Sequence, residues 1–304
     1  MRIAVIGRTE MLYNSALVLE SRGFELCCVV TARSEAEYTR DEFDFERLAT
    51  ERGIPFFKEP GSESLLDGVR EAKCDLAISV NYPKILSQEC IDVFPLGILN
   101  AHGGDLPRYR GNACQAWAIL NGESEIGLCI HKMIGGEVDA GDIIAREYLN
   151  IDIETRIGEV WDWMREQIPQ LMLAAVKSLA LDPSYILERQ SNRPKDVLRC
   201  YPRRPADGRI DWGLSAIEIV RLVKASGRPF AGAFCDLDGC KVTIWDAQLL
   251  EDEEIFCAVP GQVVAITGGR PTVACGSGKV ELVDFEIADG PRESGISSIR
   301  QRLQ

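Results

Sequence analysis

The first half of the chain alternates short apolar runs with stretches of helical periodicity, and this alternation constrains the fold more than any other feature. Continuous apolar and β-branched runs are typical of strands that are buried on both faces of a sheet. They occupy residues 2–6, 25–31, 76–80 and 98–101, and helical stretches occupy residues 11–20, 44–52, 62–71 and 87–93. Strand, helix and strand in this order predict right-handed crossovers and a Rossmann-like, mostly parallel α/β sheet.

The rest of the chain predicts a second, smaller domain. Residues 126–133 and 143–149 have strand patterns, and residues 156–179 form a long helical pattern. A polar stretch with four prolines follows, at residues 182–206, and is typical of a linker. Beyond it we expect a helix at 216–225 and a small β-barrel from strands at 233–237, 241–245, 262–266, 272–274 and 280–285. The predicted boundaries are 1–184 for the first domain, 185–206 for the linker and 207–304 for the barrel-like domain.

Composition excludes several classes of protein. The net charge of -13 disfavours nucleic acid as a partner, because phosphate binding usually requires a basic surface. No apolar run is long enough to span a membrane and no secretory signal pattern precedes the first strand, so we expect a cytoplasmic protein. The eleven cysteines form no C-x-x-C pair and only two histidines accompany them, so we expect reduced thiols and no metal site.

One segment carries polar residues at the end of a predicted strand. It spans residues 100–111 and reads N-A-H-G-G-D-L-P-R-Y-R-G. Residues two apart in a strand point to the same side, so Asn100 and His102 are expected to face one point at the carboxyl edge of the sheet, where such sheets bind ligands. An amide and an imidazole there can stabilise a carbonyl oxygen as it gains negative charge. The alternative is a histidine that only packs or caps the strand end.

A second candidate segment is the glycine-rich, acidic loop G-G-E-V-D-A-G-D at residues 135–142. Acidic side chains in such loops are usually solvated, which is the simpler interpretation. A catalytic role for the loop depends on whether one of its carboxylates reaches His102.

Both segments resemble those of the N10-formyltetrahydrofolate-dependent formyltransferases. The first is similar to N-x-H-x-S-L-L-P-x-Y/W-R-G in that family, and E-V-D-A-G-D-I-I is similar to its x-x-D-x-G-x-I-x segment. P-A-D-G-R-I-D-W, R-P-F-A-G-A-F and K-V-T-I-W-D resemble the C-terminal barrel of the family, which implies an OB-like domain. One departure from the family pattern is Gly103-Gly104-Asp105, where the family has a small residue, Ser and Leu in this order. The difference affects the expected loop shape and substrate contacts and leaves Asn100, His102 and Asp139 in place.

The resemblance implies formyl transfer from N10-formyltetrahydrofolate to a primary amine, without a metal or a covalent nucleophile. Asn100 would bind the formyl oxygen and His102 would stabilise the oxyanion. Asp139 would keep the imidazole charged and help to remove the amine proton. The co-substrate would be held largely by backbone groups. The residues implied in binding it are Val80, Asn81, Tyr82, Ile85, Leu86, Met133, Gly135, Gly136 and Asp139.

The resemblance does not fix the acceptor amine. Methionyl-tRNA formyltransferases carry a basic insertion after the second strand, whereas residues 34–44 of this chain contain five acidic residues and one basic residue. This difference, together with the barrel-like domain, favours the nucleotide-sugar branch, of aminoarabinose type, which serves lipopolysaccharide or O-antigen biosynthesis. The expected acceptor is a UDP- or dTDP-linked amino sugar. Its expected contacts are Lys84, Arg108, Tyr109, Arg110, Tyr201, Arg203 and Arg204.

Two other functions stay open at this point. One is a methionyl-tRNA formyltransferase with an acidic surface, which tight, salt-sensitive tRNA binding would reveal. The other is a non-catalytic folate-binding module, against which Asn100, His102 and Asp139 count. Barrels at the surface often contribute to dimers in this family, so a homodimer is a further expectation.

Overall fold

The protein forms two compact units, each assembled from three segments of the chain. The structure is a computed structural model that describes residues 1–59, 62–250, 254, 256–288 and 295–304. The first unit comprises Met1–Cys114, Ile126–Leu149 and Asp162–Cys200, and the second comprises Gln115–Glu125, Asn150–Trp161 and Tyr201–Gln304. The domain boundaries at residues 184 and 206 remain predictions.

The first unit is built on a seven-stranded sheet with the order β3-β2-β1-β4-β5-β7-β8. The strands are β1 (Arg2–Gly7), β2 (Glu25–Thr31), β3 (Phe56–Lys58), β4 (Leu76–Val80), β5 (Ile98–His102), β7 (Glu125–Lys132) and β8 (Ile143–Asn150). The strands from β3 to β5 are parallel to their neighbours, and β7 runs antiparallel to β5. The prediction of a Rossmann-like, mostly parallel sheet is confirmed.

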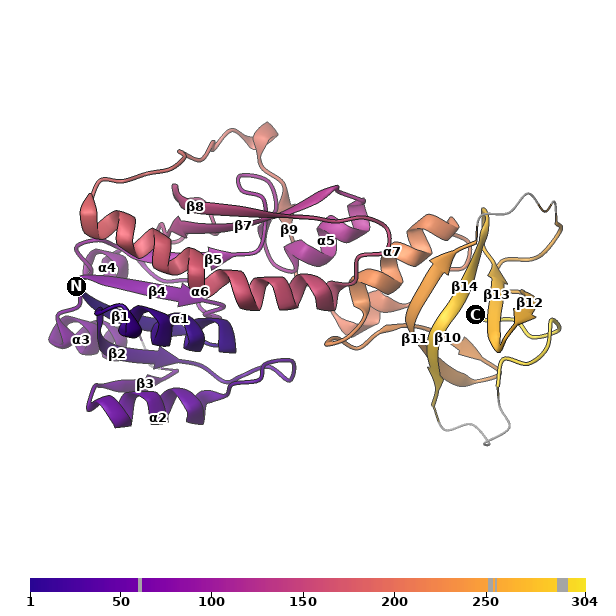
Figure 1. The fold of residues 1–304 in the computed structure, drawn as a ribbon, viewed down its shortest axis with the longest axis horizontal. Helices are drawn as coiled ribbons and strands as arrows, with labels where there is room; N and C mark the ends of the chain where they lie inside the picture. The colour runs from indigo at the N-terminus through magenta and orange to yellow at the C-terminus, as the bar shows by residue number, and fades with distance from the viewer. Residues whose placement is uncertain (60–61, 251–253, 255, 289–294) are drawn as a thin grey trace. The chain divides into compact units, whose positions relative to one another are not determined.

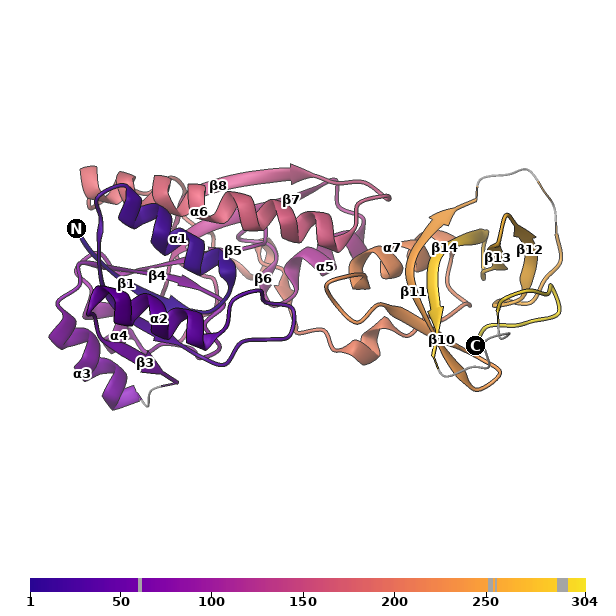
Figure 2. The same ribbon diagram turned by 60° about the horizontal axis from the view of Figure 1, so that its bottom comes forward.

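Helices lie on both faces of this sheet (Figures 1 and 2). The helices of this part of the chain are α1 (Glu10–Ser21), α2 (Glu42–Arg52), α3 (Ser62–Ala72), α4 (Gln88–Asp92), α5 (Cys114–Asn121) and α6 (Ile157–Leu181). Because both faces are covered, the central strands are mainly apolar, and Ile3, Val5 and Ile78 are fully buried. Because β4 and β5 are parallel, their carboxyl ends meet at one edge of the sheet.

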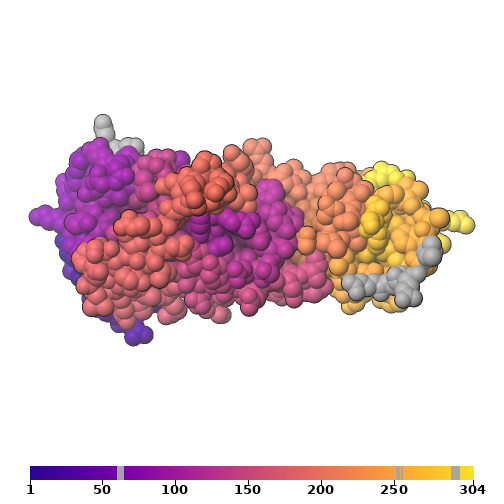
Figure 3. Space-filling view, turned by 90° about the horizontal axis from the view of Figure 1, so that it is seen from above, coloured from indigo at the N-terminus to yellow at the C-terminus, as the bar shows by residue number. Residues whose placement is uncertain are grey.

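The segment after α6 belongs to the first unit and contacts its strands at several points. Glu188 forms an isolated bridge with Ile143 of β8, and Gln190 is buried. Further on, β9 (Arg199–Cys200) pairs in parallel with β6 (Arg110–Gly111). Figure 1 shows this segment running along the outside of the sheet, in coral, and Figure 3 shows its atoms at the surface. Residues 185–200, which the sequence predicts as linker, thus supply contacts to the loop after β5.

Two cysteines of the first unit form a disulfide, which the sequence analysis did not expect. Cys27 of β2 is joined to Cys74, which directly precedes β4, with a Cα–Cα distance of 6.1 Å. The expectation of reduced thiols is therefore wrong for this pair. β2 and β4 flank β1 in the sheet, which brings the two residues within the usual disulfide range. The sulfur of Cys28 completes a buried group of three, and this is the one cluster of that kind among the described residues.

The second unit contains a five-stranded antiparallel sheet with the order β10-β11-β14-β13-β12. The elements are α7 (Ala216–Ser226), β10 (Ala233–Leu237), β11 (Cys240–Leu249), β12 (Val263–Thr267), β13 (Arg270–Ala274) and β14 (Lys279–Ile287). Residues of α7 such as Ile219 and Val223 pack with Val242, Ile244 and Leu282 of the sheet in one apolar core. The predicted small β domain is confirmed, and its OB-like character stays a prediction.

A buried ion pair holds α7 to β11 in this unit. Lys224 is 1% exposed, and its Nζ lies 2.8 Å from Asp246 Oδ1. Arg156 binds the other oxygen of Asp246 at 2.6 Å. Removing one partner of such a pair leaves a buried charge without compensation. We expect Asp246→Asn to lower the free energy of unfolding by about 3 kcal/mol, measured by urea denaturation at pH 7.

The pH dependence gives this prediction a second test. Burial alone would raise the pKa of Asp246, but hydrogen bonds and charges from Arg156 and Lys224 lower it below its usual value. Because the pKa is lower in the folded state, the ionised carboxyl group stabilises the folded protein at pH values above its unfolded-state pKa, and this stabilisation is lost as the pH falls. The free energies of unfolding of the wild type and of Asp246→Asn should therefore converge in acid. The control is Asp284→Asn, which breaks an exposed pair with Arg228 and should cost less than about 1 kcal/mol. Equal losses for both variants would contradict the prediction.

None of the helices in the described part of the chain combines the length and the apolar character that crossing a lipid bilayer requires.

Candidate active site

The candidate site lies where β5 ends between two neighbouring strands. Asn100 of β5 stands beside Ser79 of the parallel strand β4 and opposite His131 of the antiparallel strand β7. His102, two residues further along, is 7% exposed and stands opposite Cys129. Because side chains alternate along a strand, Asn100 and His102 share one face of the sheet, as the sequence predicts.

Asp139 reaches this face from the loop between β7 and β8. Its Oδ2 lies 3.4 Å from Nδ1 of His102 and accepts a hydrogen bond from the Gly111 N–H at 2.9 Å. Its Oδ1 lies 3.3 Å from Nε2 of His131. Asn100 joins the group through His131, whose Nε2 is 3.2 Å from the Asn100 Nδ2. The structure thus brings Asn100, His102 and Asp139 together around an additional histidine.

The surroundings of Asp139 keep its carboxyl group ionised. Burial by itself would raise the pKa, because it penalises the charged form. The attraction of His102 and the hydrogen bond from the Gly111 N–H oppose this effect of burial, and the pKa of the carboxyl group lies below its usual value. The backbone of Asp139 is also left-handed, with a φ of 52°, which is uncommon for a residue with a side chain. The loop therefore holds a charged carboxylate between two imidazoles.

His102 is fixed at its other nitrogen by the loop after β5. Its Nε2 lies 2.7 Å from the carbonyl oxygen of Tyr109, and since a carbonyl only accepts, Nε2 carries a hydrogen. The thiol of Cys114 donates to the same oxygen at 2.9 Å. Gly104 lies against this contact, because a Cβ there would be 2.4 Å from the Tyr109 oxygen and 2.5 Å from the His102 Nε2. The departure from the Ser of the family pattern at this position permits a close approach that a side chain would block.

We expect Gly104→Ala to lower the rate of the reaction at this candidate site about 10- to 100-fold, because displacing a group of an active site by about 1 Å can cost that much. The added methyl group must push the Tyr109 carbonyl away from His102. Steady-state kinetics with a thermal unfolding measurement would check this. Gly295→Ala is the control, since a Cβ there meets nothing within 4 Å. An unchanged rate in Gly104→Ala would mean that the contact between His102 and Tyr109 is dispensable.

The residues predicted to bind the co-substrate form two adjoining stretches. Hydrogen bonds connect the stretches, from the Gly136 N–H to the Leu86 carbonyl at 3.2 Å and from the Gly135 N–H to the Gln88 side chain at 2.8 Å. Val80 and Leu86 are buried, Tyr82 and Met133 are partly buried, and Ile85 and Asn81 are exposed. The hydroxyl of Tyr82 is buried without a hydrogen-bond partner in the described structure. The two predicted stretches therefore lie side by side in the structure.

The predicted substrate contacts of the first unit differ in how accessible they are. Lys84 and Arg108 are exposed, and the Arg108 guanidinium stacks over the ring of Tyr109 at 5.3 Å. Tyr109 is buried, with a φ of 52°. Arg110 is also buried and donates to Gln190, to the carbonyl of Ser191 and to Asn192. Arg110 therefore anchors the segment after α6, a contact 80 residues away that its sequence position does not reveal.

The other three predicted substrate contacts belong to the second unit. Tyr201 is 69% exposed, and its carbonyl accepts a hydrogen bond from Trp117. Arg204 is exposed as well. Arg203 donates to the carbonyls of Ala225 and Asp207 and to the hydroxyl of Ser226, so its guanidinium binds the chain itself.

His131 is the functional candidate that the sequence analysis missed. It is 1% exposed and lies between Asn100 and Asp139. The sequence signal for His131 was weak. It consisted of the chain having only two histidines, and placing this one beside Asn100 also required the register between β5 and β7.

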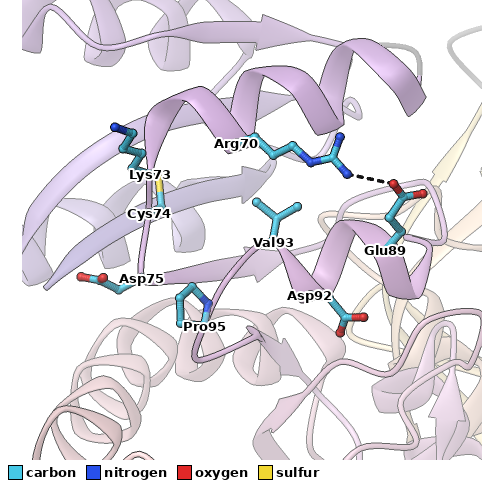
Figure 4. Close-up of a pocket in the computed structure, with 8 residues that line it drawn as sticks. All are labelled: Arg70, Lys73, Cys74, Asp75, Glu89, Asp92, Val93 and Pro95. Carbon is cyan, nitrogen blue, oxygen red and sulfur yellow. Dashed lines mark hydrogen bonds and ion pairs between the residues drawn. The ribbon is translucent and has the colours of Figure 1, made fainter.

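A separate depression of about 740 Å³ lies elsewhere on the first unit (Figure 4). It is lined by Arg70, Lys73, Cys74, Asp75, Glu89, Asp92, Val93 and Pro95. Asp75 directly precedes β4, so this depression is at the amino end of the strand, opposite the predicted site. Arg70 is paired with Glu89 at 2.9 Å across it. None of the predicted site residues lines it.

A mostly parallel sheet with an amide, an imidazole and a carboxylate at its carboxyl edge is the arrangement expected of a formyl-transferring enzyme. The family model "Formyl transferase" matches residues 1–176, and "Formyl transferase, C-terminal domain" matches residues 203–302. The chain belongs to the formyl transferase family.

Several solved structures share the fold at low sequence identity. WlaRD, described as a sugar 3N-formyl transferase and solved with dTDP and 5-N-formyl-THF, is 16% identical with a TM-score of 0.67, over 96% of this chain and 99% of its own. The N-formyltransferase from Helicobacter canadensis, solved with folinic acid and dTDP-3-aminofucose, is 15% identical with a TM-score of 0.66, over 92% and 97%. HypX from Aquifex aeolicus, in complex with tetrahydrofolic acid, is 18% identical with a TM-score of 0.64. The alignment covers 95% of this chain but only 44% of HypX.

Proposed function

We propose that this protein transfers a formyl group from N10-formyltetrahydrofolate to the primary amine of a nucleoside-diphosphate-linked amino sugar. The observation that carries the proposal is the ionised carboxylate of Asp139, which lies 3.4 Å from His102 at the end of the strand that also carries Asn100. An imidazole beside a carboxylate can hold positive charge while an oxyanion forms close by. This geometry also favours an enzyme over a non-catalytic folate-binding module.

The reaction assigns one task to each group. The amine nitrogen attacks the formyl carbon, and the carbonyl electron pair moves onto the oxygen. Asn100 donates to that oxyanion, and the Nε2–H of His102 does so by exchanging the Tyr109 carbonyl, which it binds in the structure, for the formyl oxygen. As the bond from the formyl carbon to N10 breaks, the amine proton leaves with help from Asp139, and N10 takes up a proton.

The co-substrate occupies the stretches around residues 80–86 and 133–139 in this proposal. Folate ligands are present in the structures of WlaRD, HypX and the Helicobacter canadensis protein, which supports this co-substrate for a chain of the same fold. The orphaned hydroxyl of Tyr82 is a candidate hydrogen-bonding group for it.

A UDP- or dTDP-linked amino sugar is the proposed acceptor, and the dTDP ligands of the two sugar formyltransferases support this class. The segment at residues 34–44 argues against tRNA, because two of its acidic side chains form ion pairs with cations of the protein. Glu35 pairs with Arg8 at 2.8 Å, and Glu42 pairs with Lys58 at 3.1 Å. Each such pair removes a cation that a phosphate backbone could otherwise use.

The test is a screen of UDP-, dTDP- and GDP-linked amino sugars with N10-formyltetrahydrofolate, in which mass spectrometry follows the formylated product. Charged initiator tRNA is included as a competing acceptor at physiological salt. We expect turnover of at least one nucleotide-linked amino sugar and no formylation of tRNA. Efficient tRNA formylation would overturn the assignment in favour of a methionyl-tRNA formyltransferase. Folate binding without turnover of any amine would favour the binding module.

A further inference from the structure

The second histidine of the chain is buried between two of the proposed catalytic residues. His131 stands directly opposite Asn100 across the antiparallel pair of β5 and β7, so the two side chains lie on the same face. Its Nε2 lies 3.2 Å from the Asn100 Nδ2 and 3.3 Å from the Asp139 Oδ1. Its ring also meets the ring of His102 edge to face, with centroids 6.2 Å apart. A buried imidazole with these neighbours influences the group that binds the formyl oxygen.

The backbone fixes which nitrogen of His131 carries hydrogen. Nδ1 lies 2.9 Å from the carbonyl oxygen of Lys132, and a carbonyl can only accept. The hydrogen of the neutral ring is therefore on Nδ1, and Nε2 presents a lone pair. That lone pair accepts a hydrogen bond from the amide nitrogen of Asn100. A hydrogen on Nε2 would instead bind Asp139 and repel the Asn100 N–H, so the two contacts of Nε2 are alternatives.

We propose that His131 is a positioning residue that selects the orientation of the Asn100 amide. An asparagine amide has two ends of similar shape, an NH2 group that donates and an oxygen that accepts. With Nε2 of His131 as an acceptor, one hydrogen of the Asn100 Nδ2 is bound, and the other remains a donor for the formyl oxygen. The carbonyl of Lys132 thus determines the tautomer of His131, and this tautomer determines the orientation of the Asn100 amide. In that orientation the amide presents an N–H donor to the oxyanion.

This inference rests on the proposed function in one respect, namely that the oxygen which Asn100 binds is the formyl oxygen. Without an acceptor at position 131, the amide can turn its oxygen toward the formyl oxygen, where it would repel the developing charge. We expect His131→Leu to lower kcat about 10- to 100-fold, approaching the loss of an oxyanion donor, and to leave KM for the folate nearly unchanged. His131→Gln supplies a side-chain oxygen as acceptor and should recover most of the rate.

A double-mutant cycle separates positioning from simple structural support. If His131 acts through Asn100, His131→Leu should cost less than about threefold in an Asn100→Ala background. Full additivity, with the same loss in both backgrounds, would overturn the inference. The cycle can be run with any amine that accepts the formyl group.

A spectroscopic test needs no turnover at all. Because the chain has two histidines, a His102→Asn variant labelled with nitrogen-15 histidine contains one imidazole, that of His131. We expect its nuclear magnetic resonance spectrum at pH 7 to show a protonated Nδ1 and an unprotonated Nε2, whose resonance moves when Asn100→Ala is added. A protonated Nε2 would overturn the inference, even if the acceptor proposal holds. Conversely, failure of every amino sugar would leave this result unaffected.

Discussion

His102→Asn should lower the rate of formyl transfer by more than about 1,000-fold while the protein stays folded and binds its substrates. Removing one oxyanion donor typically costs about 100- to 1,000-fold, and here the acid–base partner of Asp139 is lost with it. The work of His102 is done in the transition state, where charge appears on the formyl oxygen, so binding in the ground state should change little. Asparagine retains polar volume at the strand end, where His102 is 7% exposed.

The measurement is single-turnover formyl transfer together with calorimetric binding of the folate and of the nucleotide sugar. A thermal unfolding curve close to that of the wild type is the control for folding. If the variant reacts at a nearly normal rate, His102 is only structural, and the proposed mechanism must be abandoned. If binding falls as much as the rate, the imidazole acts on the ground state instead.

The first half of the fold could be predicted because its strands carry their signal locally. β1, β2 and β4 are buried on both faces over most of their length, so each is a mainly apolar run in which Ser79 is the one polar residue away from a strand end. β3 lacks that signal, since it has three residues and its two phenylalanines are only partly buried at the edge of the sheet. It becomes a strand by pairing with β2, which is a tertiary effect.

The candidate site was predictable only where the side chains follow from one strand. Asn100 and His102 share a face because they are two residues apart. The reach of Asp139 depends on a left-handed backbone, and the position of His131 depends on the register between β5 and β7. The anchoring of Arg110 by Gln190 joins residues 80 positions apart. Such contacts are set by packing and cannot be deduced from spacing.

Asp139→Asn is expected to have an effect of similar size through a different cause. Its carboxylate faces both imidazoles and accepts the Gly111 N–H, and its pKa is lowered, so it carries negative charge at neutral pH. Asparagine keeps the shape but removes the charge that favours a protonated His102 and the base that helps to remove the amine proton. General acid–base groups contribute about 100- to 10,000-fold, and we expect a loss of about 1,000-fold in kcat.

Asp142→Asn is the matched control, because it neutralises a carboxyl group of the same loop and keeps the oxygen that accepts the Gln190 N–H. Its rate should stay within about threefold of the wild type, as expected for a charge that does not face the imidazoles. The kcat of both variants would be compared from pH 6 to pH 9 with saturating substrates. Should Asp142→Asn lose as much activity as Asp139→Asn, the charge of the loop as a whole matters, and Asp139 has no specific role. A loss confined to Asp139→Asn at every pH, with unchanged folate binding, assigns the effect to the carboxylate between the two histidines.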